Sequence, residues 1–105
     1  MTRRADQMRE VARTMRESYA VEKLDAALIV SDAARVATLG FMSIRIRFDR
    51  PLDLQNTEAA HILVKRLTRE GFRVFWEPRR LEVRDSPNGE AMSVADLVIS
   101  WDGPD

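Results

Sequence analysis

The most regular pattern of hydrophobic and polar positions lies in residues 41–48, FMSIRIRF. Hydrophobic residues at the even positions alternate there with Ser43, Arg45 and Arg47. A period of two is typical of a strand that buries one face and exposes the other. Gly40, directly before the segment, favours the end of a preceding helix. We therefore predict a strand that begins after a helix and carries arginines on its open face.

Residues 2–39 contain neither Gly nor Pro and consist mainly of good helix formers, so this segment is predicted to be helical. The β-branched and aromatic residues in 19–21 mark the expected break between two helices. The second helix is predicted to start near Glu22, and its wider apolar surface indicates deeper burial. Gly40 suits the left-handed backbone conformation that closes such a helix.

A narrow apolar stripe runs along the first helix. It consists of Met8, Val11, Met15 and Tyr19, which follow one another at spacings of three and four residues. Two arrangements remain open. If the helix lies on the sheet, the stripe belongs to the core; if the helix projects, the stripe pairs with a second copy and the protein is a homo-oligomer. Residues 1–20 are therefore a candidate oligomerisation arm.

One helix and three strands are predicted after the first strand. The helix begins at Asp53 or Asn56, runs to about Glu70 and ends at Gly71. The strands are expected at residues 72–77, 80–85 and 97–101, separated by a turn at Pro78 and a loop at residues 86–90.

These elements predict an α+β fold. N-terminal helices precede the order β-α-β-β-β, and one helical layer packs on one face of a small mixed sheet. Residues 21–101 are expected to form a single α/β core domain, because a chain of 105 residues is large enough for one core only. Residues 102–105 are expected to fray.

Charge is unevenly distributed although the formal net charge is zero. Residues 41–84 carry nine Arg and one Lys against six acids, whereas residues 85–105 carry five acids and no base. Of the 17 basic residues 15 are Arg. A GC-rich genome or selection for bidentate donors to carboxylate and phosphate would both produce this bias. Zero net charge leaves little long-range attraction for an extended polyanion.

The chain contains few residues suited to catalysis. It has no cysteine, a single histidine at His61, and glycines too scattered for a phosphate-binding loop. We therefore expect no enzyme activity, no cofactor and no metal site. The N-terminus lacks a secretory signal, and no apolar run reaches the roughly 20 residues needed to span a bilayer. A cytoplasmic protein without a membrane partner is the expectation.

The sheet face that no predicted helix covers is the candidate ligand or partner site. Guanidinium groups beside a stacking ring suit a nucleotide, a single-stranded nucleic acid or an acidic protein surface. The alternative is a solvated face neutralised by Glu77, Glu82 and the acidic C-terminal segment. The predicted binding residues on this face are Arg45, Arg47, Arg73, Phe75, Arg80 and Arg84.

Hydrophobic and glycine positions over residues 24–101 also form a familiar arrangement: a helix that ends in Gly, a strand, a Leu-containing helix, a Gly-aromatic strand and a closing ISW. This arrangement resembles small orphan α/β proteins of tailed bacteriophages. The resemblance implies a phage protein in a bacterial host cytoplasm, in a class rich in accessory factors that bind host proteins or host signalling molecules. It implies no catalytic residue. The segments that carry it are residues 34–40, 43–46, 63–71, 72–74 and 97–101.

The sequence thus favours a non-catalytic, homo-oligomeric accessory binding protein of phage type. Its expected role is to antagonise a host system, such as a defence system, by occluding a host protein or by sequestering an anionic nucleotide ligand. Two alternatives remain open. One is a nucleic-acid-binding regulator, and the other is a virion or assembly component in which the N-terminal helix mediates assembly.

Overall fold

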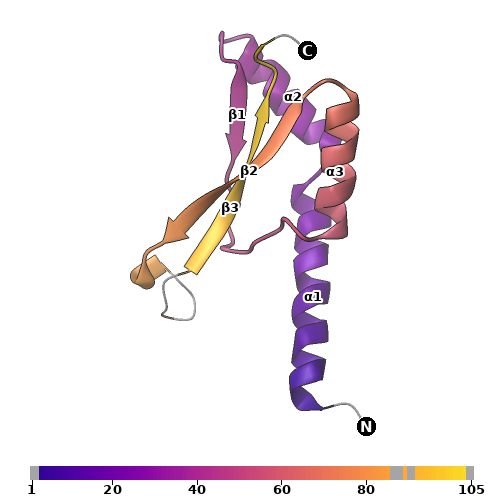
Figure 1. Cartoon of the computed structure of the whole chain (residues 1–105), viewed down its shortest axis with the longest axis vertical. Helices are drawn as coiled ribbons and strands as arrows, with labels where there is room; N and C mark the ends of the chain where they lie inside the picture. Colours follow the sequence, from indigo (N-terminus) through magenta and orange to yellow (C-terminus); the bar gives the residue numbers. More distant parts are fainter. Residues whose placement is uncertain (1–2, 86–88, 90–91, 104–105) are drawn as a thin grey trace.

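The computed structural model describes residues 3–85, 89 and 92–103. Three helices lie on one side of a three-stranded antiparallel sheet (Figure 1). The α+β class with N-terminal helices is confirmed. The elements are α1 (Arg4–Lys23), α2 (Ala26–Ala37), β1 (Ser43–Ile46), α3 (Glu58–Arg69), β2 (Arg73–Leu81), the 3-10 turn η1 (Val83–Asp85) and β3 (Met92–Ser100).

The sheet differs from the prediction in the number and pairing of its strands. Its order is β1-β3-β2, and β3 runs antiparallel to both neighbours. β1 and β2 are therefore parallel to each other but separated by β3, so every neighbouring pair is antiparallel and the predicted mixed sheet is not formed. β3 is buried from Val94 to Ile99, because a central strand is covered on both faces and flanked on both edges.

Pro78 does not divide two strands, contrary to the prediction. β2 continues through it to Leu81, with Pro78 opposite Ala95 of β3. β2 is an edge strand, and an edge strand tolerates proline because its outward N–H groups have no partner in the ladder. The predicted strand 80–85 is consequently absent: its first residues belong to β2 and residues 83–85 form η1.

The break between the first two helices lies later than predicted. Residues 19–21 are helical, and the chain leaves α1 at Leu24. Asp25 begins α2 because its side chain accepts hydrogen bonds from the backbone N–H of Ala27 at 2.9 Å and of Leu28 at 3.3 Å. This carboxylate fixes the boundary more strongly than the β-branched residues before it.

Two side chains cap the start of α3. Thr57, and neither Asp53 nor Asn56, is the N-cap: its hydroxyl accepts from the N–H of Ala60 at 3.1 Å. Glu17 of α1 accepts from the N–H of Glu58 at 2.5 Å, so α1 satisfies a second free donor of α3. At the other end Gly71 has φ +97 and closes the helix as predicted.

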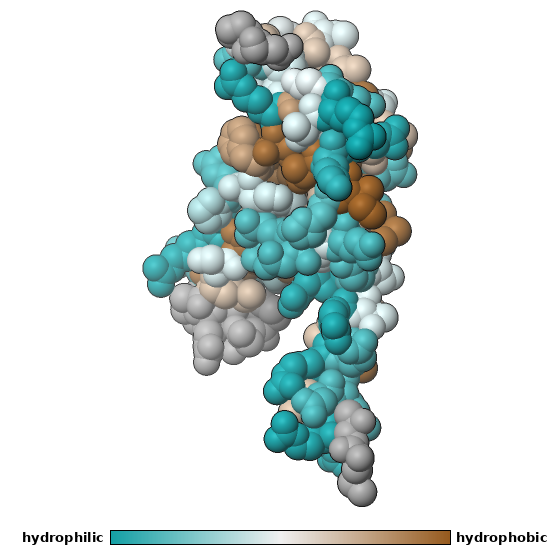
Figure 2. All heavy atoms as spheres, turned by 45° about the vertical axis from the view of Figure 1, so that its right-hand side comes forward, coloured by the Kyte–Doolittle hydropathy of each residue, from teal (hydrophilic) through white to brown (hydrophobic). Residues whose placement is uncertain are grey.

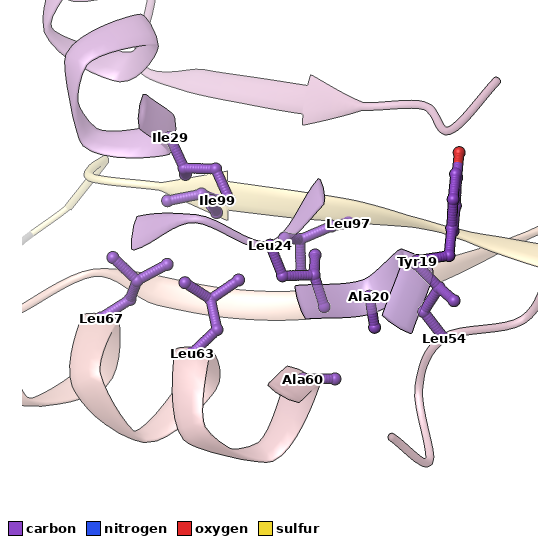
Figure 3. Close-up of a cluster of buried hydrophobic side chains, with 10 residues drawn as sticks. All are labelled: Tyr19, Ala20, Leu24, Ile29, Leu54, Ala60, Leu63, Leu67, Leu97 and Ile99. Atoms are coloured by element: carbon purple, nitrogen blue, oxygen red, sulfur yellow. The ribbon is translucent and has the colours of Figure 1, made fainter. Parts of the chain in front are cut away.

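The hydrophobic core lies between the helices and one face of the sheet. In Figure 3 Leu63 and Leu67 of α3 point toward the sheet, where Leu97 and Ile99 of β3 meet them. Leu24, at the end of α1, fills the space between the layers. Burial of such aliphatic side chains is the main contribution to the stability of a domain of this size.

Tyr19 belongs to this core and not to the exposed stripe, which corrects its predicted role in oligomerisation. Its ring is buried, its hydroxyl donates to the Asp49 carboxylate, and the same hydroxyl accepts from the N–H of Arg50 at 3.1 Å. Burial and the bond to Asp49 raise the pKa of Tyr19, and the same bond lowers the pKa of Asp49. Tyr19 therefore ties the segment after β1 to α1.

The first part of α1, residues 4–16, projects away from the core (Figure 1). Every side chain in it is exposed except Asp6, which is partly exposed. Met8, Val11 and Met15 are 66%, 63% and 54% exposed, so the projecting arrangement of the stripe is the one observed. We call residues 4–16 the arm. Among the described residues, no helix is long and apolar enough to span a membrane.

Candidate functional site

The candidate site is the sheet face opposite the helices. Side chains of neighbouring strands form rows across it, because paired residues of a sheet point to the same side. Arg45 of β1, Val98 of β3 and Phe75 of β2 form one row, and Asp96 and Glu77 lie in the next. The prediction that Arg45, Arg73 and Phe75 share the open face agrees with this register.

A buried carboxylate lies at the centre of this face. Asp96 is only 1% exposed, yet no helix covers it. Its oxygens lie 3.1 Å from a terminal nitrogen of Arg45, 3.2 Å from Nε of Arg79 and 3.6 Å from Nε of Arg47. We call Arg45, Arg47, Arg79, Asp96 and Glu77 the arginine cluster. Three guanidinium groups around two carboxylates leave one formal positive charge.

Arg45 crosses the central strand to reach both acids. It bonds to Asp96 on β3 and to Glu77 on β2, the far strand. The bond to Glu77, followed by the bond to Asp96, raises the pKa of Arg45. Its aliphatic stem consequently lies over β3, and Arg79 reaches the same carboxylate from β2. Long arginine stems thus cover the central strand in place of a helical layer.

The outer part of the face remains accessible. Arg47 has a side chain that is 64% exposed, and Phe75 is 47% exposed. Arg73 is exposed in the row of Ser43 and Ser100. The guanidinium group of Arg73, the ring of Phe75 and the serine hydroxyl groups therefore lie around the arginine cluster. Such a surface can accept carboxylates and stack a planar or apolar group.

Two of the predicted binding residues lie elsewhere. Arg80 alternates with Arg79 along β2 and therefore faces the side of the sheet occupied by Val74 and Trp76. Arg84 lies in η1, beyond the end of the strand. Both positions follow from the continuation of β2 through Pro78. A separate strand at residues 80–85 would have placed Arg80 and Arg84 on the open face, whereas in the continuous strand that face is taken by Arg79 and the strand ends before Arg84. The remaining predicted residues, Arg45, Arg47, Arg73 and Phe75, are grouped on the open face.

Two residues of the site were missed by the sequence analysis. Arg79 is separated from Arg73 and Phe75 by an even number of residues, so an uninterrupted strand would have placed all three side chains on the open face. Asp96 alternates with Leu97, whose hydrophobic side chain faces the helices. That alternation was the available signal for an acid on the open face, but Asp96 lay outside the predicted strand.

The helical side carries different surfaces. Figure 2 shows hydrophobic surface in the upper half of the molecule and a mainly hydrophilic arm below it. His61 is exposed on α3 and lines a groove of about 500 Å³ together with Gln55, Lys65 and Trp76. Among the described residues, no group of three His, Cys, Asp or Glu side chains is placed to hold a metal ion. The groove therefore offers polar contacts from His61, Gln55 and Lys65 beside the ring of Trp76.

The fold and the open face together define a class: a small α+β protein whose three-stranded sheet exposes a basic surface with an aromatic ring. Comparison with protein-family models, curated proteins and solved structures gives no match for this chain. Any assignment of function therefore depends on the chemistry of its own surfaces.

Proposed function

We propose that this chain is a non-catalytic accessory binding protein of phage type that antagonises a host system by occluding an acidic surface of a host protein. The open face of the sheet is the observation that carries the proposal. Arg47, Arg73 and Phe75 are accessible there, and they stand beside an arginine cluster whose geometry is held by the buried Asp96. Prearranged arginines lower the entropic cost of binding a partner.

Occlusion of a protein is favoured over sequestration of an anionic nucleotide by the state of Arg45. Its guanidinium already bonds to two carboxylates, Asp96 and Glu77, so it has little free capacity for a phosphate. A three-stranded sheet also presents a broad surface, which suits a macromolecular partner. A nucleic-acid partner is less favoured because acids offset much of the positive charge on this face.

The biological setting is part of the proposal. The resemblance to small phage proteins supports action in a bacterial host cytoplasm, with a defence system as one class of target. The exposed arm supports a homo-oligomer as the acting species, since a projecting helix with three exposed apolar side chains is marginal in water without a partner.

The proposal is tested by capture from a bacterial lysate with matched variants. We expect the wild-type chain to retain an acidic host protein stoichiometrically, and Arg47→Glu or Phe75→Ala to reduce its affinity about tenfold or more. Arg84→Glu is the control, because it makes the same charge change at a side chain that is 86% exposed and lies off the face. Retention that is equal in wild type, Arg47→Glu and Phe75→Ala would refute the sheet-face site.

Native mass spectrometry of the purified protein distinguishes occlusion of a host protein from sequestration of an anionic nucleotide. A phosphorylated small molecule released on denaturation, and absent from Arg47→Glu, would replace occlusion by nucleotide sequestration. Loss of the captured material after nuclease treatment would indicate nucleic acid instead.

A further inference from the structure

The line of α1 that contains the exposed residues Met8, Val11 and Met15, here called the seam, has a charge pattern along its whole length. At 100° per residue, six residues fall on one narrow line of the helix surface, and all are exposed. Hydrophobic side chains occupy the middle of this line, and opposite charges occupy its two ends. The six seam residues are Arg4, Met8, Val11, Met15, Ser18 and Glu22.

The rest of the helix surface is divided in the same way. Between residues 5 and 18, every charged side chain lies on the half of α1 away from the seam. The seam itself is bordered by Ala5, Gln7, Ala12 and Thr14, which are small or uncharged. The middle of the seam, from Met8 to Ser18, is therefore a helix face without charge, and its uncharged borders allow close approach of a second helix.

The seam is complementary to itself in one direction only. If a second copy runs antiparallel with Val11 opposite Met15, then Met8 faces Ser18 and Arg4 faces Glu22, and each pair occurs twice by symmetry. A parallel pair would instead place Arg4 against Arg4 and Glu22 against Glu22. Like charges at facing positions destabilise a helical pair, so the charge pattern selects the antiparallel arrangement.

We propose that two copies of this chain pair through α1 as an antiparallel helix dimer in this register. This dimer specifies the homo-oligomer of the proposed function, and it rests on the proposed function only for the expectation of a homo-oligomer. It does not depend on the binding role of the open sheet face, which is a separate surface. Among the described residues, neither Arg4 nor Glu22 forms an ion pair within its own chain. Both charges are therefore available to the partner copy.

The length of the overlap supports this register. Seam contacts from Arg4 to Glu22 span about 27 Å of helix, whereas a register that joins only Met8 to Val11 would use the arm alone. Specific dimers bury on the order of 1,200 Å² or more, so the longer overlap is the one that approaches a stable interface. It also covers Met8, Val11 and Met15 on both copies at once.

Sedimentation equilibrium with charge-reversed variants tests the dimer. Arg4→Glu and Glu22→Arg should each weaken dimerisation about tenfold, since two ion pairs become two repulsions. The double variant Arg4→Glu/Glu22→Arg should restore dimerisation, because the two charges have then exchanged places and each facing pair is again of opposite charge. Arg13→Glu is the matched control on the opposite side of the helix and should leave the dimer unchanged. A wild-type chain that stays monomeric at high concentration, its stripe covered only when another protein is added, would overturn the proposal.

Disulfide cross-linking tests the direction, and the absence of native cysteine makes its result unambiguous. A mixture of Met8→Cys and Ser18→Cys chains should cross-link, because the two positions face each other and a disulfide needs Cα atoms within about 7 Å. Met8→Cys alone should not, since its two copies lie about 15 Å apart along the antiparallel axis. Efficient cross-linking of Met8→Cys alone would exclude the proposed register, because Met8 faces Met8 in a parallel pair or in an antiparallel pair centred on residue 8. If the dimer fails while capture by the sheet face persists, only this inference falls.

Discussion

The two faces of β3 are equally buried but by different means. On one face Leu97 and Ile99 lie under three helices, in a core of aliphatic side chains. On the other, Asp96 and Val98 are 1% and 7% exposed although no helix lies above them. There the side chains of Arg45 and Arg79 extend over the strand from its two neighbours.

The comparison shows that a small protein can bury a central strand without a second helical layer. The aliphatic face gains stability from removal of apolar surface from water. The charged face must offset the desolvation of Asp96, and it does so with hydrogen bonds to several guanidinium groups. The first face is suited to stability. The second retains exposed positive groups at its rim, so it is also suited to binding.

The largest expected effect comes from the aliphatic face. Leu97→Ala removes a fully buried side chain and leaves a cavity between β3 and α3. We expect a loss of about 2–5 kcal/mol in the free energy of unfolding, measured by urea denaturation. A loss below 1 kcal/mol would mean that this side of the sheet is not the tightly packed one.

A smaller effect is expected from the charged face. Asp96→Ala leaves three guanidinium groups without their shared acceptor, but their side chains are 30–64% exposed and can turn to water. We expect a loss of about 1–3 kcal/mol in the same denaturation experiment, with part of it recovered in Asp96→Asn. A loss equal to or greater than that of Leu97→Ala would reverse the ranking of the two faces.

The smallest effect tests the edge of the aliphatic core. Tyr19→Phe keeps the ring but removes the hydroxyl that accepts from the N–H of Arg50, which should cost about 1 kcal/mol. It also removes the hydrogen bond that lowers the pKa of Asp49.

This substitution has a pH signature with a defined sign. A carboxylate whose pKa is lowered in the folded state stabilises the protein above its unfolded pKa, and that stability is lost as pH falls through the folded value. The wild type should therefore lose more stability than Tyr19→Phe as pH falls below the ordinary Asp value of 3.8. Parallel pH profiles of the two proteins would show that Asp49 is not stabilised by Tyr19.

Local patterns predicted much of the fold. The left-handed glycines Gly40 and Gly71 and the alternation of arginines with hydrophobic residues along β1 each follow from backbone chemistry or from periodicity within a few residues. The prediction failed at Pro78 because proline stops a strand only where its missing N–H would have had a partner. Edge position is a property of the sheet and cannot be recognised within the segment.

For the candidate site, alternation alone identified Arg45, Arg47, Arg73 and Phe75 as residues of one open face. Arg79 and Asp96 required the correct extent of β2 and β3, and the misplacement of Arg80 and Arg84 has the same origin. A register error of one residue moves a side chain to the opposite face. Tyr19 was likewise assigned by spacing to the stripe, although its hydroxyl binds a segment thirty residues away.

The sequence by itself determined the α+β class, the helical N-terminus, a strand within FMSIRIRF that the structure limits to Ser43–Ile46, and the separation of charged from apolar positions along α1. Each of these depends on residues close together in the chain. Tertiary structure alone decided that β3 enters between β1 and β2, that Asp96 is enclosed by arginines, and that the arm projects. These features depend on contacts between distant segments, whose free energies depend on geometry and burial that no local pattern contains.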